Sequence, residues 1–175
     1  MKKILLVAAM LLIFGIAQAQ INVGATIGVQ IPTGNFGDGY KTGFGINAVG
    51  KYMLNENMAV GLNLGYSRFG TGVTDFSSSM IPITGLFEYH FGTENIKPYI
   101  GADLGLYDYM VKIKFLGESS SDSKIFFGFA PTAGVLYGLN DNLSLCANLK
   151  YNYVTSEGDA ATWLGINVGV VYKIK

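Results

Sequence analysis

The chain contains few residues of the types that carry out catalytic or metal chemistry. His90 is the single histidine and Cys146 the single cysteine among 175 residues. A Ser-His-Asp triad would have to use His90, and neither an intrachain disulfide nor a cysteine-based zinc site can form. The sequence therefore predicts no catalytic residues, no metal site and no cofactor.

Four charged residues recur within alternating apolar stretches, on the side that carries the smaller residues. They are Lys51, Glu88, Asp103 and Lys150. If these stretches are β-strands, side chains alternate between two faces, and all four charges fall on the face that carries the smaller residues. Opposite charges enclosed in a narrow interior should pair. We expect a structural charge cluster, with a proton or ion path as the alternative.

The elements that would position these charges show a period of two. In the last stretch, Leu164, Ile166 and Val168 alternate with Gly165 and Asn167. Such alternation is typical of a strand with one apolar face. The pattern recurs and predicts eight strands, at residues 21–32, 44–54, 58–67, 81–91, 98–115, 127–138, 143–153 and 163–175. In the fifth stretch the apolar set changes parity after Tyr107, which predicts a bulge or the point where the strand leaves the bilayer.

The segments between these strands alternate in length. Segments 55–57, 92–97 and 140–142 are short, whereas 33–43, 68–79, 116–124 and 156–162 are longer and polar. Short turns at one end and longer loops at the other are typical of outer-membrane barrels, with the short turns in the periplasm. The sequence therefore predicts an all-β fold, an eight-stranded antiparallel up-and-down transmembrane β-barrel.

The turns also predict the strand register. The three-residue turns would pair Leu54 with Met58 and Leu139 with Leu143, and paired residues face the same way. For the charged residues, the predicted partners are Gly61 for Lys51, Gly101 for Glu88, Leu86 for Asp103 and Thr132 for Lys150.

Aromatic residues should form two bands on the lipid-facing side, as in barrels of this kind. The expected outer band is Phe44, Tyr66, Phe127, Phe129, Tyr151, Tyr153 and Trp163. The expected periplasmic band is Tyr52, Tyr89, Phe91, Tyr99, Tyr137 and Tyr172.

The N-terminus has the form of a secretory signal peptide. Lys2 and Lys3 precede an apolar run that ends in Ala17-Gln18-Ala19. We expect residues 1–19 to be the signal and residues 20–175 the barrel domain. Without the two leader lysines, ten of the twelve basic residues remain against twelve acidic ones, so the balance gives no reason to expect nucleic-acid binding.

Three segments resemble the small outer-membrane β-barrel proteins of gram-negative bacteria, of the OmpA and OmpX type. They are residues 31–45, the strand entry Lys97-Pro98-Tyr99, and the C-terminal strand, which ends on Lys175 rather than an aromatic residue. The resemblance covers the whole mature chain. It implies location in the outer membrane, contact with outer-membrane lipids and lipopolysaccharide, and recognition of the C-terminal strand by the barrel-assembly machinery.

The sequence leaves several functions open. We expect a monomeric, non-enzymatic barrel, structural or adhesive, whose outer loops make the contacts. The alternatives are a narrow pore or small-molecule transport barrel and, less favoured, a lipid-modifying enzyme. A soluble lipocalin-like barrel is disfavoured because only 14% of residues are charged.

Overall fold

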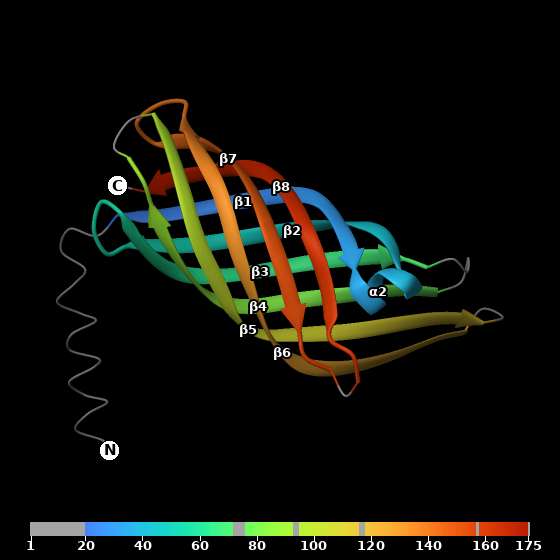
Figure 1. Cartoon of the computed structure of the whole chain (residues 1–175). Coiled ribbons are helices and arrows are strands. Elements are labelled where there is room, and N and C mark those ends of the chain that lie inside the picture. Colours follow the sequence, from blue (N-terminus) through green and yellow to red (C-terminus); the bar gives the residue numbers. More distant parts are fainter. Residues whose placement is uncertain (1–19, 72–75, 93–94, 116–117, 157, 175) are drawn as a thin grey trace, which may run out of the picture.

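The computed structural model describes residues 20–71, 76–92, 95–115, 118–156 and 158–174. Their strands form a closed antiparallel barrel in which each strand pairs with its neighbours in sequence and β8 closes onto β1 (Figure 1). The strands are β1 (Ile21–Thr33), β2 (Lys41–Met53), β3 (Met58–Gly70), β4 (Phe76–His90), β5 (Ile96–Phe115), β6 (Glu118–Gly138), β7 (Leu143–Val154) and β8 (Ala161–Ile174). The predicted fold class is confirmed. The expected signal peptide, residues 1–19, lies outside the described residues.

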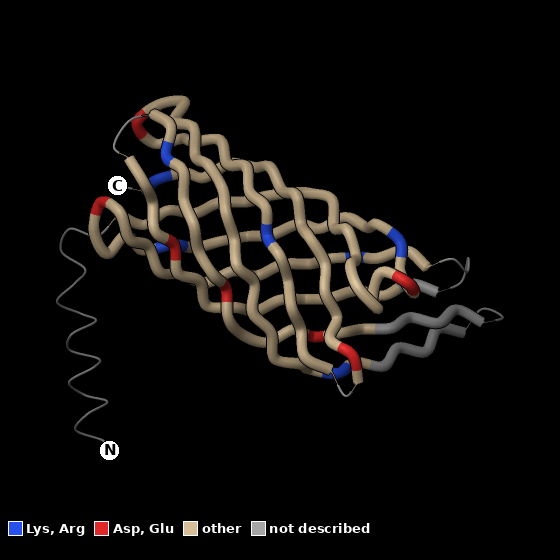
Figure 2. Tube along the Cα trace, viewed as in Figure 1, with Lys and Arg blue, Asp and Glu red and all other residues tan. Residues whose placement is uncertain are grey.

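The barrel wall carries large apolar side chains outward and small or polar side chains inward. In β1, Ile27 is 63% exposed, whereas its neighbour Thr26 is 7% exposed and faces the lumen. The same alternation runs through the other strands, and charged positions are sparse along the middle of the wall (Figure 2). An apolar outer surface is the arrangement that lipid requires. Among the described residues, no helix has the length and apolar character needed to cross a membrane.

The short turns have the predicted register. The backbone N–H of Leu54 donates to the carbonyl of Met58, and that of Leu139 to Leu143, both at 2.8 Å. All four predicted partners of the charged residues are also confirmed by the strand pairing. The short turns and the end of β8 lie at one end of the barrel (Figure 1), which is the periplasmic end by the usual rule for these proteins.

The outer end is more ordered than the sequence predicted. The segment expected to be a loop at 33–43 contains a short helix, α2 (Gly34–Gly39), whose Phe36 is buried. Gly34 has a φ of 56°, a conformation that glycine adopts most easily. Strands β2, β3, β4, β6 and β8 also extend into the segments expected to be loops, and most of 116–124 belongs to the β5–β6 hairpin.

The prediction of a bulge after Tyr107 is wrong. The registers of β4 with β5 and of β5 with β6 run through Tyr107 without a shift. The change in apolar parity arises where Tyr107 and Tyr109 point inward and join an apolar cluster at the outer end of the lumen. The alternative, that the strand leaves the bilayer at this point, stays a prediction. The recorded register shift lies instead between β2 and β3, where the pair Phe44–Arg68 is followed by Lys41–Gly70.

Two members of the expected aromatic bands do not face lipid. Trp163 is 1% exposed and Tyr99 is 2% exposed, and both point into the lumen. Each is adjacent to an outward-facing residue, Leu164 and Ile100 respectively, so strand alternation requires them to face inward. Phe44, Phe127 and Tyr151 in the outer band are exposed as predicted.

Candidate functional site

The periplasmic half of the lumen contains an ion pair between β2 and β4. Lys51 Nζ lies 2.8 Å from Glu88 Oε1, and His90 Nε2 lies 3.1 Å from Glu88 Oε2. Glu88 and His90 share the inner face because they are two residues apart in β4. The ring of Tyr99 stacks on His90, with centroids 5.3 Å apart, and Lys51 Nζ lies 5.3 Å from the Tyr99 ring centroid. The cation is therefore held by a carboxylate and an aromatic face.

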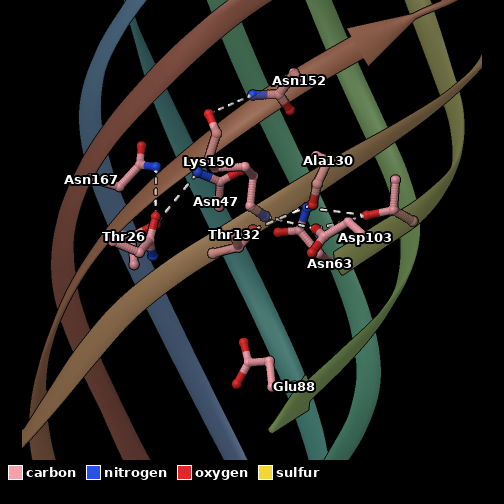
Figure 3. A network of polar contacts seen from close by, with 12 residues as sticks. Thr26, Asn47, Asn63, Glu88, Asp103, Ala130, Thr132, Lys150, Asn152 and Asn167 are labelled. Carbon is pink, nitrogen blue, oxygen red and sulfur yellow. Dashed lines mark hydrogen bonds and ion pairs between the residues drawn. The ribbon is translucent and has the colours of Figure 1, made fainter. Parts of the chain in front are cut away.

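A second ion pair lies nearer the outer end. Lys150 Nζ on β7 is 2.7 Å from Asp103 Oδ2 on β5. Thr84 donates to the same carboxylate oxygen at 3.2 Å, and Asn63 donates to the Thr84 hydroxyl at 3.3 Å. Figure 3 shows Glu88 set apart from this group. The structure thus brings the four predicted residues into the lumen as two separate pairs rather than as one network.

A chain of amide side chains connects the two ends of the lumen, and the sequence analysis did not identify it. Trp163 Nε1 donates to Gln30 at 3.1 Å, Gln30 donates to Asn167 at 3.0 Å, and Asn167 donates to Asn148 at 2.9 Å. The available signal was their position on the inward parity of β1, β7 and β8. The chain continues through Cys146, which lies within 3.7 Å of the Asn148 amide and 3.4 Å of the Tyr99 hydroxyl.

The outer end of the lumen is filled by apolar side chains beneath α2. Phe36 lies edge-on to Phe69, with ring centroids 5.1 Å apart, and Phe69 and Tyr107 both contact Trp163 in T-shaped geometry. We call this set the outer apolar cluster; its buried members are Phe36, Phe69, Met80, Tyr107, Val154, Ala161 and Trp163. Hydrogen bonds from Asn35 to Asp159 and between Thr33 and Thr162 connect the N-terminal end of the α2 segment to β8 and to the loop before it.

The free space in the lumen is very uneven. A cavity of about 20 Å³ lies beside the two ion pairs, where Lys51, Asp103 and Lys150 line it. That volume holds one or two water molecules. A much larger hollow of about 780 Å³ opens at the periplasmic end, with His90 and Leu136 among its lining residues. Water can therefore enter from the periplasm as far as His90, while side chains fill the barrel beyond it.

The arrangement offers little for covalent chemistry. His90 contacts Glu88 rather than a serine or cysteine nucleophile, and it lies at the periplasmic end. Within the described part of the chain, no three His, Cys, Asp or Glu residues are grouped so that they could hold a metal ion. The polar groups of the lumen bond mainly with one another.

Comparisons with known proteins agree with this architecture. The family model for the outer membrane protein β-barrel domain matches residues 5–173. Neisserial surface protein A has a similar structure, with a TM-score of 0.66 and 22% identity over 90% of this chain and 99% of that one. The attachment invasion locus protein of Yersinia pestis has a TM-score of 0.59 and 21% sequence identity, and the match covers 89% of this chain and 97% of that one. OprG from Pseudomonas aeruginosa has a TM-score of 0.54 and 15% sequence identity, and the match covers 89% of this chain and 95% of that one. A search of curated protein sequences found no match.

Proposed function

Because the chain belongs to the outer-membrane β-barrel family, we propose that it is a non-enzymatic barrel of the gram-negative outer membrane whose outer end makes adhesive or structural contacts. The observation that carries the proposal is the β5–β6 hairpin. Pairing of β6 with β7 ends at Gly128–Val154, whereas pairing of β6 with β5 continues to Glu118–Phe115. This extension rises past the last β6–β7 pair together with β4, which pairs with β5 as far as Phe76–Ile113, so only the tip of the hairpin is two-stranded.

The edge of this hairpin adds to its suitability for contacts. On the side of β7, strand pairing of β6 ends at Gly128 with Val154, and residues 118–123 of β6 extend past this last pair. An unpaired strand edge offers N–H and C=O groups to another molecule. Similar structures include one named for attachment, the Yersinia pestis protein, which has also been solved with the heparin analogue sucrose octasulfate. That likeness supports an outer contact role and does not identify its partner.

The rival functions receive less support. A pore needs a continuous water path, whereas the lumen holds two ion pairs and the outer apolar cluster. A lipid-modifying enzyme needs a catalytic group near its lipid substrate, whereas His90 is enclosed inside the barrel with Glu88.

The test is to shorten the hairpin without opening the barrel. Met110 and Ser123 are a strand pair, so an Asn-Gly turn can replace residues 111–122 between them. A gram-negative host expressing this variant should adhere less to immobilised heparin or cultured cells than one expressing the original chain. A control that keeps the hairpin length and permutes residues 111–122 separates length from sequence. Equal adherence of the shortened and original proteins, at equal outer-membrane levels, would contradict the proposal.

A further inference from the structure

The bulge between β2 and β3 changes the direction of one cationic side chain. Two residues, Thr42 and Gly43, lie opposite Phe69 alone, and Lys41 then pairs with Gly70. Without the extra residue, Lys41 would continue the inward parity of Lys51 and Gly45. With it, Lys41 takes the outward face, since a Cβ built on the outward side of Gly70 would lie 3.8 Å from the Lys41 Cβ. A side chain at position 43 would meet the Arg68 carbonyl oxygen, so glycine is required there.

This reversal places Lys41 beside Arg68 on the outward face of the barrel. Arg68 pairs with Phe44, one row below Lys41 and Gly70. Diagonal neighbours in antiparallel strands lie about 7–8 Å apart, within reach of long side chains. Both side chains are exposed. Among the described residues, neither forms an ion pair or a side-chain hydrogen bond. Two adjacent cations without a carboxylate partner repel each other until an anion joins them.

The height of this pair matches the outer boundary of the apolar band. Lys41 pairs with Gly70, which is ten residues from Val60, the partner of Tyr52 in the periplasmic band; this is about 33 Å of strand and about 25 Å along the membrane normal at a tilt near 40°. Arg68 is eight residues from Val60, the partner of Tyr52, which corresponds to about 20 Å of height by the same conversion. An apolar band of about 25 Å ends near these levels. The two cations therefore lie where lipid headgroups begin: Arg68 is level with exposed Phe44 and one row above Tyr66, and Lys41 is one row higher.

Lys41 and Arg68 are confined to one side of the barrel. On β1, the neighbour of β2, and on β8 and β7 further round the barrel, the corresponding outward residues are uncharged, as Val29, Leu164 and Tyr151 exemplify. On the near side, the described carboxylate that shares the outward face is Asp108, in the row below Arg68 and two strands away. A general attraction to anionic membranes would distribute charge around the rim, whereas among the described side chains of β1, β2, β3, β7 and β8 the outward cations at this level are confined to this pair.

We propose that Lys41 and Arg68 form a binding site for a phosphate group of an outer-leaflet lipid, a phosphorylated glycolipid whose acyl chains lie against Phe44 and Tyr66. The guanidinium of Arg68 matches phosphate with two parallel hydrogen bonds, and the Lys41 ammonium adds a second charge. The outward direction of both side chains selects a lipid-borne phosphate over a soluble one, since the aromatic neighbours belong to the lipid-facing band. This site is independent of the contacts proposed for the β5–β6 hairpin.

The experiment measures lipid binding to the detergent-solubilised full-length barrel by native mass spectrometry. The probes are diphosphoryl lipid A and the same lipid with both phosphates removed. We expect the phosphorylated form to bind about tenfold more tightly, the scale of one charge-assisted hydrogen-bonded contact. The double variant Lys41→Gln/Arg68→Gln should lose this preference. The control variant Lys97→Gln removes a cation at the periplasmic end and should keep it.

Two further measurements separate the outcomes. Both variants should show the same change in gel mobility on heating as the unmodified protein, because Lys41 and Arg68 are exposed and Lys97 borders the open periplasmic hollow. Excess inorganic phosphate should not displace the lipid; displacement would show a site for soluble anions and overturn the lipid assignment. Retention of the phosphate preference by the double variant, or its equal loss in Lys97→Gln, would overturn the site itself.

Discussion

Lys51 Nζ lies 2.8 Å from Glu88 Oε1 inside the barrel, and both side chains are more than nine-tenths enclosed. Removing one member of a buried ion pair leaves the other charge without compensation, which costs about 3–5 kcal/mol, whereas removing both can be nearly neutral. We therefore expect Lys51→Met to lower the free energy of unfolding by about that amount.

The matched control is the double variant Lys51→Met/Glu88→Gln, in which no unpaired carboxylate remains. Urea unfolding in lipid vesicles gives the free energy of unfolding of the original protein, the single variant and the double variant. The double variant should recover most of the free energy that the single variant loses. A double variant no more stable than the single one would show that the loss comes from packing rather than from charge.

The second prediction tests the two faces of the wall. Leu104 is 57% exposed on the lipid side, so Leu104→Arg should cost roughly 2–4 kcal/mol near the bilayer midplane. Asn63 faces the lumen and donates one hydrogen bond, to Thr84, so Asn63→Ser should cost only about 1 kcal/mol. The same unfolding assay compares the stability losses of the two variants. A larger loss for Asn63→Ser than for Leu104→Arg would mean that the lipid-facing and lumen-facing sides are assigned the wrong way round.

The third prediction is that the barrel does not conduct. The midsection has only about 20 Å³ of free space beside the ion pairs, and the outer apolar cluster lies beyond it. We expect no steady single-channel currents in planar bilayers. Reproducible current steps whose size changes with Glu88→Gln would identify the lumen as a pore and remove the main argument against a transport role.

The fourth prediction concerns Tyr40, between α2 and β2. Its hydroxyl lies 2.6 Å from that of Tyr109. Burial, together with this hydrogen bond, raises the pKa of Tyr40 to about 12. The unfolded value is about 10. Because the folded pKa is the higher one, its contribution to stability is complete below pH 10 and is lost between about pH 10 and 12.

The measurement is a titration of tyrosinate absorbance for the original protein and for Tyr40→Phe. Their difference should correspond to one tyrosine that ionises near pH 12. A difference curve centred near the ordinary value would mean that Tyr40 is solvated and that the contact with Tyr109 is not maintained.

Much of the wall could be predicted because alternation and turn length are local properties. The inward positions of Glu88 and Asp103 follow from the parity of their neighbours, and a three-residue turn leaves one register for Leu54 and Met58. Trp163 and Tyr99 could have been placed correctly by the same parity. They were assigned to the lipid side because aromatic residues are common there, although Leu164 and Ile100 already occupied that face.

Other features depend on tertiary packing and leave little trace in the sequence. The α2 segment Gly-Asn-Phe-Gly-Asp-Gly has poor helix propensity, and its Phe36 is buried among residues of β3, β5 and β8 that are distant in the chain. The bulge at Thr42 and Gly43 resembles ordinary alternation until the partner strand is known. The division of four charges into two pairs depends on side-chain reach across the lumen, which strand register alone does not determine.

The outer apolar cluster has a consequence for how the barrel is retained in the membrane. Phe36, Phe69 and Trp163 come from three separate hairpins, and they can meet only after all three have crossed the bilayer. Insertion therefore proceeds without these contacts, whereas extraction must first break them and expose their apolar surface, at about 25 cal/mol for each Å². The cluster forms only after the hairpins have crossed to the outer side of the membrane, so the free-energy barrier to extraction is higher than the barrier to insertion.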